Sequence, residues 1–224
     1  MTQIFVEQPP HPSDVNRGTP AAPKPRQNLA RVWQTVGLIG LLVALLGGGV
    51  WWLWPHEFHG VLLQSPDLAP DFSLTASTGK PVQLSDFRGK VVLLFFGYTA
   101  CTDVCPLRLA ELMQTMSLLG KDAEKVQVIF VTIDPLHDTV ARLNRYVNAF
   151  DPAFLGVTGP TATINAVATQ FGVFYDQAAM TAGSAIGHTS TVTVIDRAGH
   201  VRLLLPAGLS TADIAEDLRY LIRR

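Results

Sequence analysis

The sequence of 224 residues has few of the features of a disulfide-rich secreted domain or a nucleic-acid-binding protein. Only two residues are cysteine, so a network of disulfides cannot hold the fold together. Charged residues make up 16% of the chain and nearly cancel, at a formal net charge of −1. Lysine and arginine form no basic stripe, which argues against nucleic acid as a partner. The length suffices for one domain with additional segments.

The first 31 residues contain little that could be buried in a core. Prolines recur at positions 9, 10, 12, 20, 23 and 25, among asparagine, glutamine and alanine. This composition predicts a disordered tail over residues 1–31. Four basic residues lie in the part of the tail that precedes the next segment: Arg17, Lys24, Arg26 and Arg31.

Residues 32–54 form an uncharged, apolar run that predicts a single transmembrane helix. A run of 23 residues is long enough to cross a hydrocarbon layer of about 30 Å. Trp33 lies near one end and Trp54 at the other, as in interfacial aromatic belts. The basic flank before the run predicts a cytoplasmic N-terminus, with the remainder of the chain on the outer, periplasmic-type side of the membrane. A cleavable signal peptide is disfavoured, because no small-residue cleavage site follows directly.

Residues 55–65 are predicted to be a linker, and residues 66–224 a globular α/β domain. Two β-branched, apolar runs, at 91–96 and 126–133, predict central parallel strands joined by a helix over 107–119. Further elements are expected as hairpins at 71–84 and 190–205, a short strand at 154–157, and helices at 140–150, 161–171 and 210–223, with Asp138 as the N-cap of the first of these helices. This order predicts a thioredoxin-like layout, with a mixed central sheet flanked by helices.

The only two cysteines, Cys101 and Cys105, fall between a predicted strand and a predicted helix. Pro106 suits the first turn of that helix, where a backbone N–H is not needed. The unpaired N–H groups and the dipole of a helix N-terminus favour thiolate over thiol. Two thiolates there can carry out redox chemistry or bind a soft metal. The C-x3-C spacing differs from the C-x2-C of thioredoxin-type redox centres, and a second cysteine pair for a four-thiolate zinc site is absent from the sequence.

Histidine is the natural third ligand, and His188 is the best placed of six. It stands just before the strand predicted from residue 190, in a loop that a thioredoxin-like sheet brings close to the cysteine turn. The other histidines are predicted in the tail (His11), the linker (His56 and His59), an Asp-Pro loop (His137) and a hairpin turn (His200). Cys101, Cys105 and His188 would form a soft, low-coordinate site, which favours copper.

Three motifs in order resemble the SCO/SenC family of copper chaperones for the binuclear copper centre of cytochrome c oxidase. They are Gly97-Tyr98-Thr99-x-Cys101-x-x-x-Cys105-Pro106, Ile133-Asp134-Pro135-x-x-Asp138-Thr139 and His188-Thr189. The resemblance covers about residues 66–224. It implies a thioredoxin-like fold, binding of Cu(I) or Cu(II) by Cys101, Cys105 and His188, and delivery to cytochrome c oxidase or another cuproprotein.

The chain departs from the family pattern at four positions around this site. Thr102 replaces a frequent proline, His137 a frequent arginine, Gly187 a usual aspartate, and Asn165 an acidic residue. These changes alter the charge near the predicted metal site and leave its three ligands in place. Two other functions stay open for the same residues. One is a thiol–disulfide oxidoreductase that uses Cys101 and Cys105 to reduce a cuproprotein client. The other is a peroxidase-like antioxidant or redox sensor.

Overall fold

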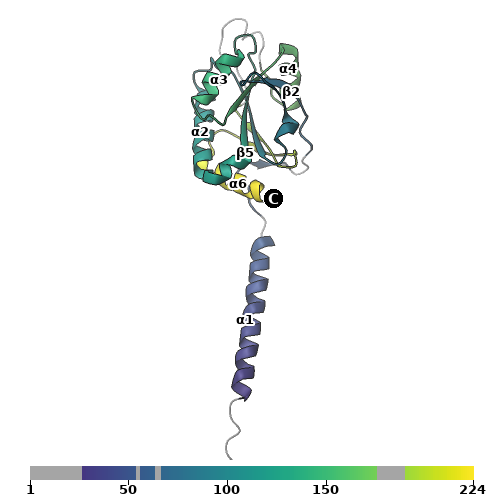
Figure 1. The fold of residues 1–224 in the computed structure, drawn as a ribbon, viewed down its shortest axis with the longest axis vertical. Coiled ribbons are helices and arrows are strands. Elements are labelled where there is room, and N and C mark those ends of the chain that lie inside the picture. Colours follow the sequence, from purple (N-terminus) through teal and green to yellow (C-terminus); the bar gives the residue numbers. More distant parts are fainter. Residues whose placement is uncertain (1–26, 54–55, 64–66, 176–189) are drawn as a thin grey trace, which may run out of the picture. The chain divides into compact units, whose positions relative to one another are not determined.

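The computed structural model describes residues 27–53, 56–63, 67–175 and 190–224 (Figure 1). The chain divides into two compact units, residues 1–55 and 56–224. The described part of the first unit is helix α1 (Gln27–Leu53). Among the described residues, no helix combines the length and the apolar character needed to cross a membrane. The transmembrane helix predicted at 32–54 is therefore not confirmed.

An eight-stranded mixed sheet is the centre of the second unit, and its strands lie in the order β1-β8-β7-β4-β5-β6-β2-β3. Strands β4, β5 and β6 run parallel, and the remaining pairs are antiparallel. The strands are β1 (Val61–Leu62), β2 (Ser73–Ala76), β3 (Pro81–Gln83), β4 (Val91–Gly97), β5 (Val126–Thr132), β6 (Leu155–Thr158), β7 (Val192–Ile195) and β8 (Val201–Leu205). The predicted mixed sheet, with two parallel central strands, is confirmed.

Strand β4 is buried along all seven of its residues. It pairs with β5 on one side, from Val91 opposite Val126 to Gly97 opposite Thr132, and with β7 on the other. A strand covered on both faces and on both edges has no solvent-facing positions, which explains its unbroken apolar sequence. β4 therefore gives the cysteine loop that follows it a rigid support.

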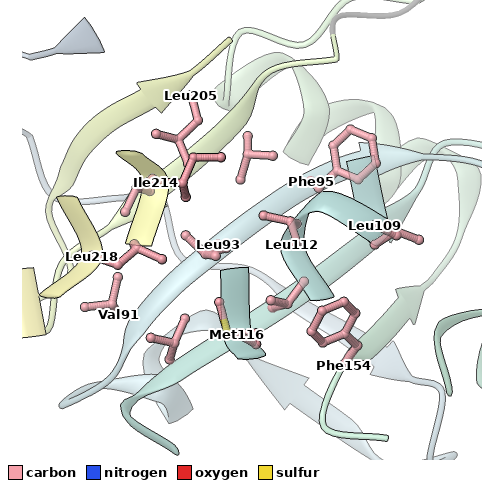
Figure 2. Close-up of a cluster of buried hydrophobic side chains, with 14 of the residues drawn as sticks. Val91, Leu93, Phe95, Leu109, Leu112, Met116, Phe154, Leu205, Ile214 and Leu218 are labelled. Atoms are coloured by element: carbon pink, nitrogen blue, oxygen red, sulfur yellow. The ribbon is translucent and has the colours of Figure 1, made fainter. Parts of the chain in front are cut away.

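Alternate residues of β4 point into two separate hydrophobic clusters. Val91, Leu93 and Phe95 pack against helices α2 (Val104–Leu119) and α6 (Thr211–Arg223), together with α3 (Val140–Asn148), on one face of the sheet (Figure 2). The opposite face is covered by helix α4 (Thr161–Gln170) and the 3-10 turn η1 (Leu84–Phe87). A second 3-10 segment, η2 (Gly120–Lys125), connects α2 to β5. Helices thus lie on both faces, as the sequence predicts.

Residues 56–63, expected to be linker, contribute to the second unit through contacts with α6 and β8. Asp217 on α6 is fully buried and accepts hydrogen bonds from the backbone N–H groups of His59, at 3.1 Å, and Gly60, at 2.9 Å. The His56 ring stacks on Tyr220 at 4.4 Å between ring centroids. β1 then adds to the edge of the sheet beside β8. Residues 56–63 therefore pack against α6 and β8 as part of the domain.

Candidate metal and redox site

The two cysteines lie where β4 ends and α2 begins, as the sequence predicts. The loop between these elements turns tightly, because the backbone N–H of Cys101 donates to the carbonyl of Tyr98 at 3.2 Å. Both cysteines are present as thiols. Cys101 is partly exposed, whereas Cys105 lies in the first turn of α2 and is fully buried. The two sulfur atoms therefore differ in access to solvent.

The sulfur of Cys101 acts as an acceptor at the N-terminus of α2. Asp103, the N-cap residue, makes no side-chain capping bond, and the backbone N–H of Cys105 donates to Cys101 Sγ at 3.4 Å. Burial raises the pKa of the Cys101 thiol, but hydrogen bonds from the backbone N–H groups of Cys105, Asp103 and Val104 and from the Cys105 side chain together outweigh it and leave the pKa below its ordinary value. The predicted stabilisation of a thiolate by the helix N-terminus holds for this cysteine.

Burial dominates the electrostatics of Cys105 and raises the pKa of its thiol far above the ordinary value. The charges of Cys101 and Asp138 raise it further, while a backbone hydrogen bond from Tyr98 has the opposite effect. Gly97 provides the space for this sulfur: a Cβ at position 97 would lie 2.8 Å from Cys105 Sγ and 2.8 Å from Phe130 Cε2. A glycine is needed there because the sulfur approaches the strand backbone closely.

The buried carboxylate of Asp138 connects the cysteine loop to the end of β5. It accepts hydrogen bonds from the backbone N–H of Thr99 at 3.0 Å and from Thr132 Oγ1 at 2.6 Å, as well as from the Thr99 hydroxyl. The prediction that Asp138 is the N-cap of α3 is wrong. Thr139 is the N-cap, because its hydroxyl accepts from the backbone N–H of Arg142. Asp138 is instead a positioning residue that the sequence motif alone could not place.

The remaining residues singled out by the sequence lie in different parts of the chain. His188 and Gly187 lie outside the described residues. His137 Nδ1 lies 2.9 Å from the carboxylate oxygens of Asp134, and Asn165 accepts a hydrogen bond from the Tyr175 hydroxyl. Elsewhere, His59 Nδ1 lies 3.1 Å from Asp217, and His200 Nδ1 lies 3.6 Å from Asp196. Across the described segments, no group of three or more histidine, cysteine or acidic side chains is arranged to hold a metal ion.

One further polar group lies beside the cysteine pair, on α3. The hydroxyl of Tyr146 is buried without a hydrogen-bond partner among the described residues. Its ring packs on Phe130, at 5.5 Å between centroids, the same ring that contacts the space around Gly97 and Cys105. Burial first, and then the charges of Cys105 and Cys101, raise the pKa of this phenol well above its ordinary value. It is therefore a neutral phenol at physiological pH.

The chemistry of this site follows from the contrast between its two sulfur atoms. Cys101 is accessible and prone to ionise, which suits it to attack a disulfide or to capture a soft metal ion. Cys105, one helical turn away, is shielded and can close a disulfide or complete a two-sulfur site. The donor set fits a soft metal such as Cu(I), whose preferred ligands are thiolates.

The fold and this site define a thioredoxin-like protein with an unequal cysteine pair at the N-terminus of a helix. The chain belongs to the SCO1/SenC family, whose family model matches residues 62–223. The mitochondrial SCO2 homolog of Bos taurus is 33% identical over 234 residues, which cover 96% of this chain and 81% of the bovine protein. For the mouse, bovine and zebrafish SCO2 homologs, the match spans between 58% and 81% of the relative's own length.

Solved structures bear out the fold. Bradyrhizobium japonicum ScoI with copper bound has a TM-score of 0.64 at 35% sequence identity, over 69% of this chain and 99% of that one. BsSco, described as a member of the Sco family of cytochrome c oxidase assembly proteins with a disulfide switch, matches at 22% identity and a TM-score of 0.60 over 72% and 98%. The predicted thioredoxin-like α/β fold is confirmed.

Proposed function

We propose that this chain binds copper through Cys101, Cys105 and His188 and delivers it to a cuproprotein, with the binuclear copper site of cytochrome c oxidase as the client. The observation that carries the proposal is the cysteine pair, with one sulfur at the surface and the other buried one helical turn away. Copper bound to B. japonicum ScoI supports the identity of the metal. Copper is the cargo of this protein.

The unequal exposure of the two sulfur atoms suits transfer of a metal ion. An incoming thiol from a client can approach the accessible Cys101, while Cys105 is enclosed by the hydrophobic cluster beneath α2. Ligand exchange can then proceed one sulfur at a time, so that the ion is never released into water. The hydrogen bonds from Thr99 to Asp138 hold the loop in place during the exchange.

A second function for the same cysteines is thiol–disulfide exchange with a client. An accessible thiol of lowered pKa beside a buried thiol is the arrangement of an attacking and a resolving cysteine. In that reaction Cys101 forms a mixed disulfide with the client, and Cys105 then displaces the client thiol. The client cysteines leave reduced, and a Cys101–Cys105 disulfide remains.

An anaerobic Cu(I) titration of the reduced full chain, against a chromophoric competing chelator, tests the copper function. We expect one tightly bound equivalent, lost in Cys101→Ala, Cys105→Ala and His188→Ala and retained in the matched control His200→Ala. Unchanged affinity of His188→Ala would exclude the three-ligand site. Absence of tight binding, together with turnover of a disulfide substrate that depends on both cysteines, would favour the oxidoreductase.

The same proposal includes a membrane location for the copper site. The uncharged run at residues 32–54, its flanking tryptophans and the preceding basic residues support an anchor with the domain on the outer side of the membrane. Extraction of membranes with alkaline carbonate checks the anchor, because an integral segment stays with the lipid. A protease added to intact spheroplasts checks the topology, since it should digest the domain beyond residue 55.

A further inference from the structure

A cavity in the domain lies away from the cysteines, beside the edge strand β1 and its neighbour β8 and near the amino end of β4. It is a cavity of about 430 Å³, within the range of sites that bind small organic ligands. Its walls come from the segment before β1, the β7–β8 turn and the last turn of α6. Its lining includes Phe58, Leu62, Arg197, Arg202, Tyr220 and Arg224.

The cavity lies near the amino end of strand β4. Arg197 Nε donates to the carbonyl of Gly89, two residues before β4 begins. The cysteine loop follows the other end of β4, at Gly97. A strand rises about 3.3 Å per residue, so about 20 Å of buried strand separates the two regions. The cavity is therefore distinct from the cysteine site, and its role does not depend on copper.

Positive charge dominates the walls of this cavity. Three guanidinium groups line it, from Arg197, Arg202 and Arg224, against one side-chain carboxylate, from Asp196. That carboxylate pairs with Arg202, whose Nε donates to Asp196 Oδ2 at 2.7 Å. The side chains that line the cavity therefore carry a net charge of +2. Guanidinium groups bind phosphate and carboxylate oxygens through paired hydrogen bonds.

The arginines are held in place by contacts with the protein, so little ordering is needed on binding. Arg197 Nη1 donates to the carbonyl of Ile222 at the end of α6, at 3.2 Å. The Arg224 guanidinium lies over the Tyr220 ring, at 5.1 Å from its centroid. Arg202 uses Nε for Asp196, and among the described residues its two terminal nitrogens have no acceptor. Preorganised donors favour affinity because fewer rotamers are lost.

Aromatic and aliphatic side chains complete the cavity and its surroundings. Phe58 and Tyr220 lie edge to face, with ring centroids 5.2 Å apart, and form one wall. Leu62 lines the cavity and is 47% exposed, and the neighbouring Val61 is 55% exposed. Apolar surface beside anchored cations is suited to a ligand that is part anion and part hydrocarbon.

We propose that this cavity binds the headgroup of an anionic phospholipid, with the phosphate at Arg224 and Arg202 and the first carbons of the acyl chains along Leu62 and Val61. Both the cations and the apolar rim are used by such a ligand, whereas free phosphate uses only the cations. The site lies beside His56, where the chain joins the domain. It would hold this edge of the domain against a lipid surface.

The test uses the full chain in uncharged detergent, titrated with dihexanoylphosphatidylglycerol. Dihexanoylphosphatidylcholine, of equal chain length but no net charge, and inorganic phosphate are the comparison ligands. Backbone amide shifts of Ala198 and Leu62, which line the cavity, report binding, and the amide of Leu109 in the core of the domain serves as reference. Saturable shifts are expected for the anionic lipid, with about tenfold weaker binding of the other two ligands.

Arg224→Gln and Arg223→Gln form a matched pair of variants. Both remove one positive charge from the last residues of the chain, both positions are exposed, and Arg224 lines the cavity. Arg224→Gln should weaken binding about tenfold and Arg223→Gln less than about twofold. Equal weakening by both would overturn the site in favour of a diffuse basic surface. No saturable shift, or equal affinity for either comparison ligand, would also overturn the proposal.

Discussion

Thr99 and Asp138 are 39 residues apart in the chain, yet the backbone N–H of Thr99 donates to Asp138 Oδ2 at 3.0 Å. The same carboxylate accepts from Thr132 Oγ1 at 2.6 Å and is 1% exposed. The loop that carries Cys101 is thus fastened to the carboxyl end of β5 by one buried anion. The geometry of this loop therefore depends on the charge of the Asp138 carboxylate as well as on the shape of that side chain.

Asp138→Asn should therefore destabilise the domain. The amide group keeps the shape of the carboxylate but places an N–H₂ against donors, so that one hydrogen bond to a charged group is lost, at a cost of about 1.5–3 kcal/mol. Urea unfolding measures the loss. The control is Asp103→Asn, because Asp103 is exposed and its side chain makes no capping bond. Equal stability of the two variants would show that the buried carboxylate is dispensable.

Gly97→Ala should strain the packing between β4 and α2. Its Cβ would lie 2.8 Å from both Cys105 Sγ and Phe130 Cε2, so that one of them must move. Overpacking of this kind costs about 1–3 kcal/mol. Gly156→Ala is the comparison, since its nearest contact would be Leu143 Cβ at 3.1 Å and its cost should be smaller. Thermal unfolding ranks the two variants, and the reverse ranking would contradict the geometry.

The two cysteines should react with iodoacetamide in a fixed order. Cys101 is partly exposed and its pKa lies below the ordinary value, whereas Cys105 is fully buried with a raised pKa. Mass mapping after brief labelling of the metal-free chain at about pH 7.5 should find Cys101 alone modified. Cys105 should become reactive only when urea unfolds the domain. Simultaneous labelling of both thiols in the folded protein would disprove this inequality.

Stability should fall as the pH rises through the titration of His59. Its hydrogen bond with Asp217 raises the pKa of His59 above 6.5, against the smaller effect of its burial, and Asp213 and Glu216 add to the rise. A raised pKa contributes stability that is present below the unfolded value and is lost as pH increases through the folded value. Urea midpoints between about pH 6 and pH 8.5 measure the decline. His59→Gln should flatten this part of the profile, although the neighbouring His56 is unchanged in this variant.

Removal of the Tyr146 hydroxyl should lower the free energy of unfolding little or not at all. The group is buried without a partner among the described residues, so Tyr146→Phe removes a desolvated dipole and no hydrogen bond. Tyr175→Phe is the contrasting variant, because the Tyr175 hydroxyl donates to Asn165 and its loss should cost about 1 kcal/mol. Equilibrium unfolding compares them. A larger loss for Tyr146→Phe would mean that its hydroxyl has a stabilising partner.

Much of the sheet could be predicted from the sequence because its central strands are buried on both faces. The run at 91–96 is apolar throughout, and the run at 126–133 is apolar except for Gln127 and Thr132, so each can be recognised from local sequence alone. β1 was not predictable, since two residues carry no periodic pattern and the strand exists through its pairing with β8. The same applies to residues 56–60, whose partner Asp217 lies more than 150 residues away.

The candidate site was predictable in part for a similar reason. The position of Cys101 and Cys105 between a strand and a helix follows from local pattern, and so does the effect of the helix N-terminus on Cys101. The high pKa of Cys105 depends on burial of the face of α2 on which it lies, which the spacing of two cysteines does not reveal. Asp138 illustrates the same limit: local sequence suggested an N-cap, and a contact across 39 residues determined its role.

The length of β4, with its seven buried residues, also sets the distance between the cysteine thiols and the region where the chain joins the domain. The chain joins the domain beside α6, and the thiols follow the other end of β4. The sheet thus serves as a spacer about 20 Å long. A protein that approaches Cys101 and a ligand bound beside residue 56 would use opposite ends of β4, so the two could be engaged at the same time without competing for space.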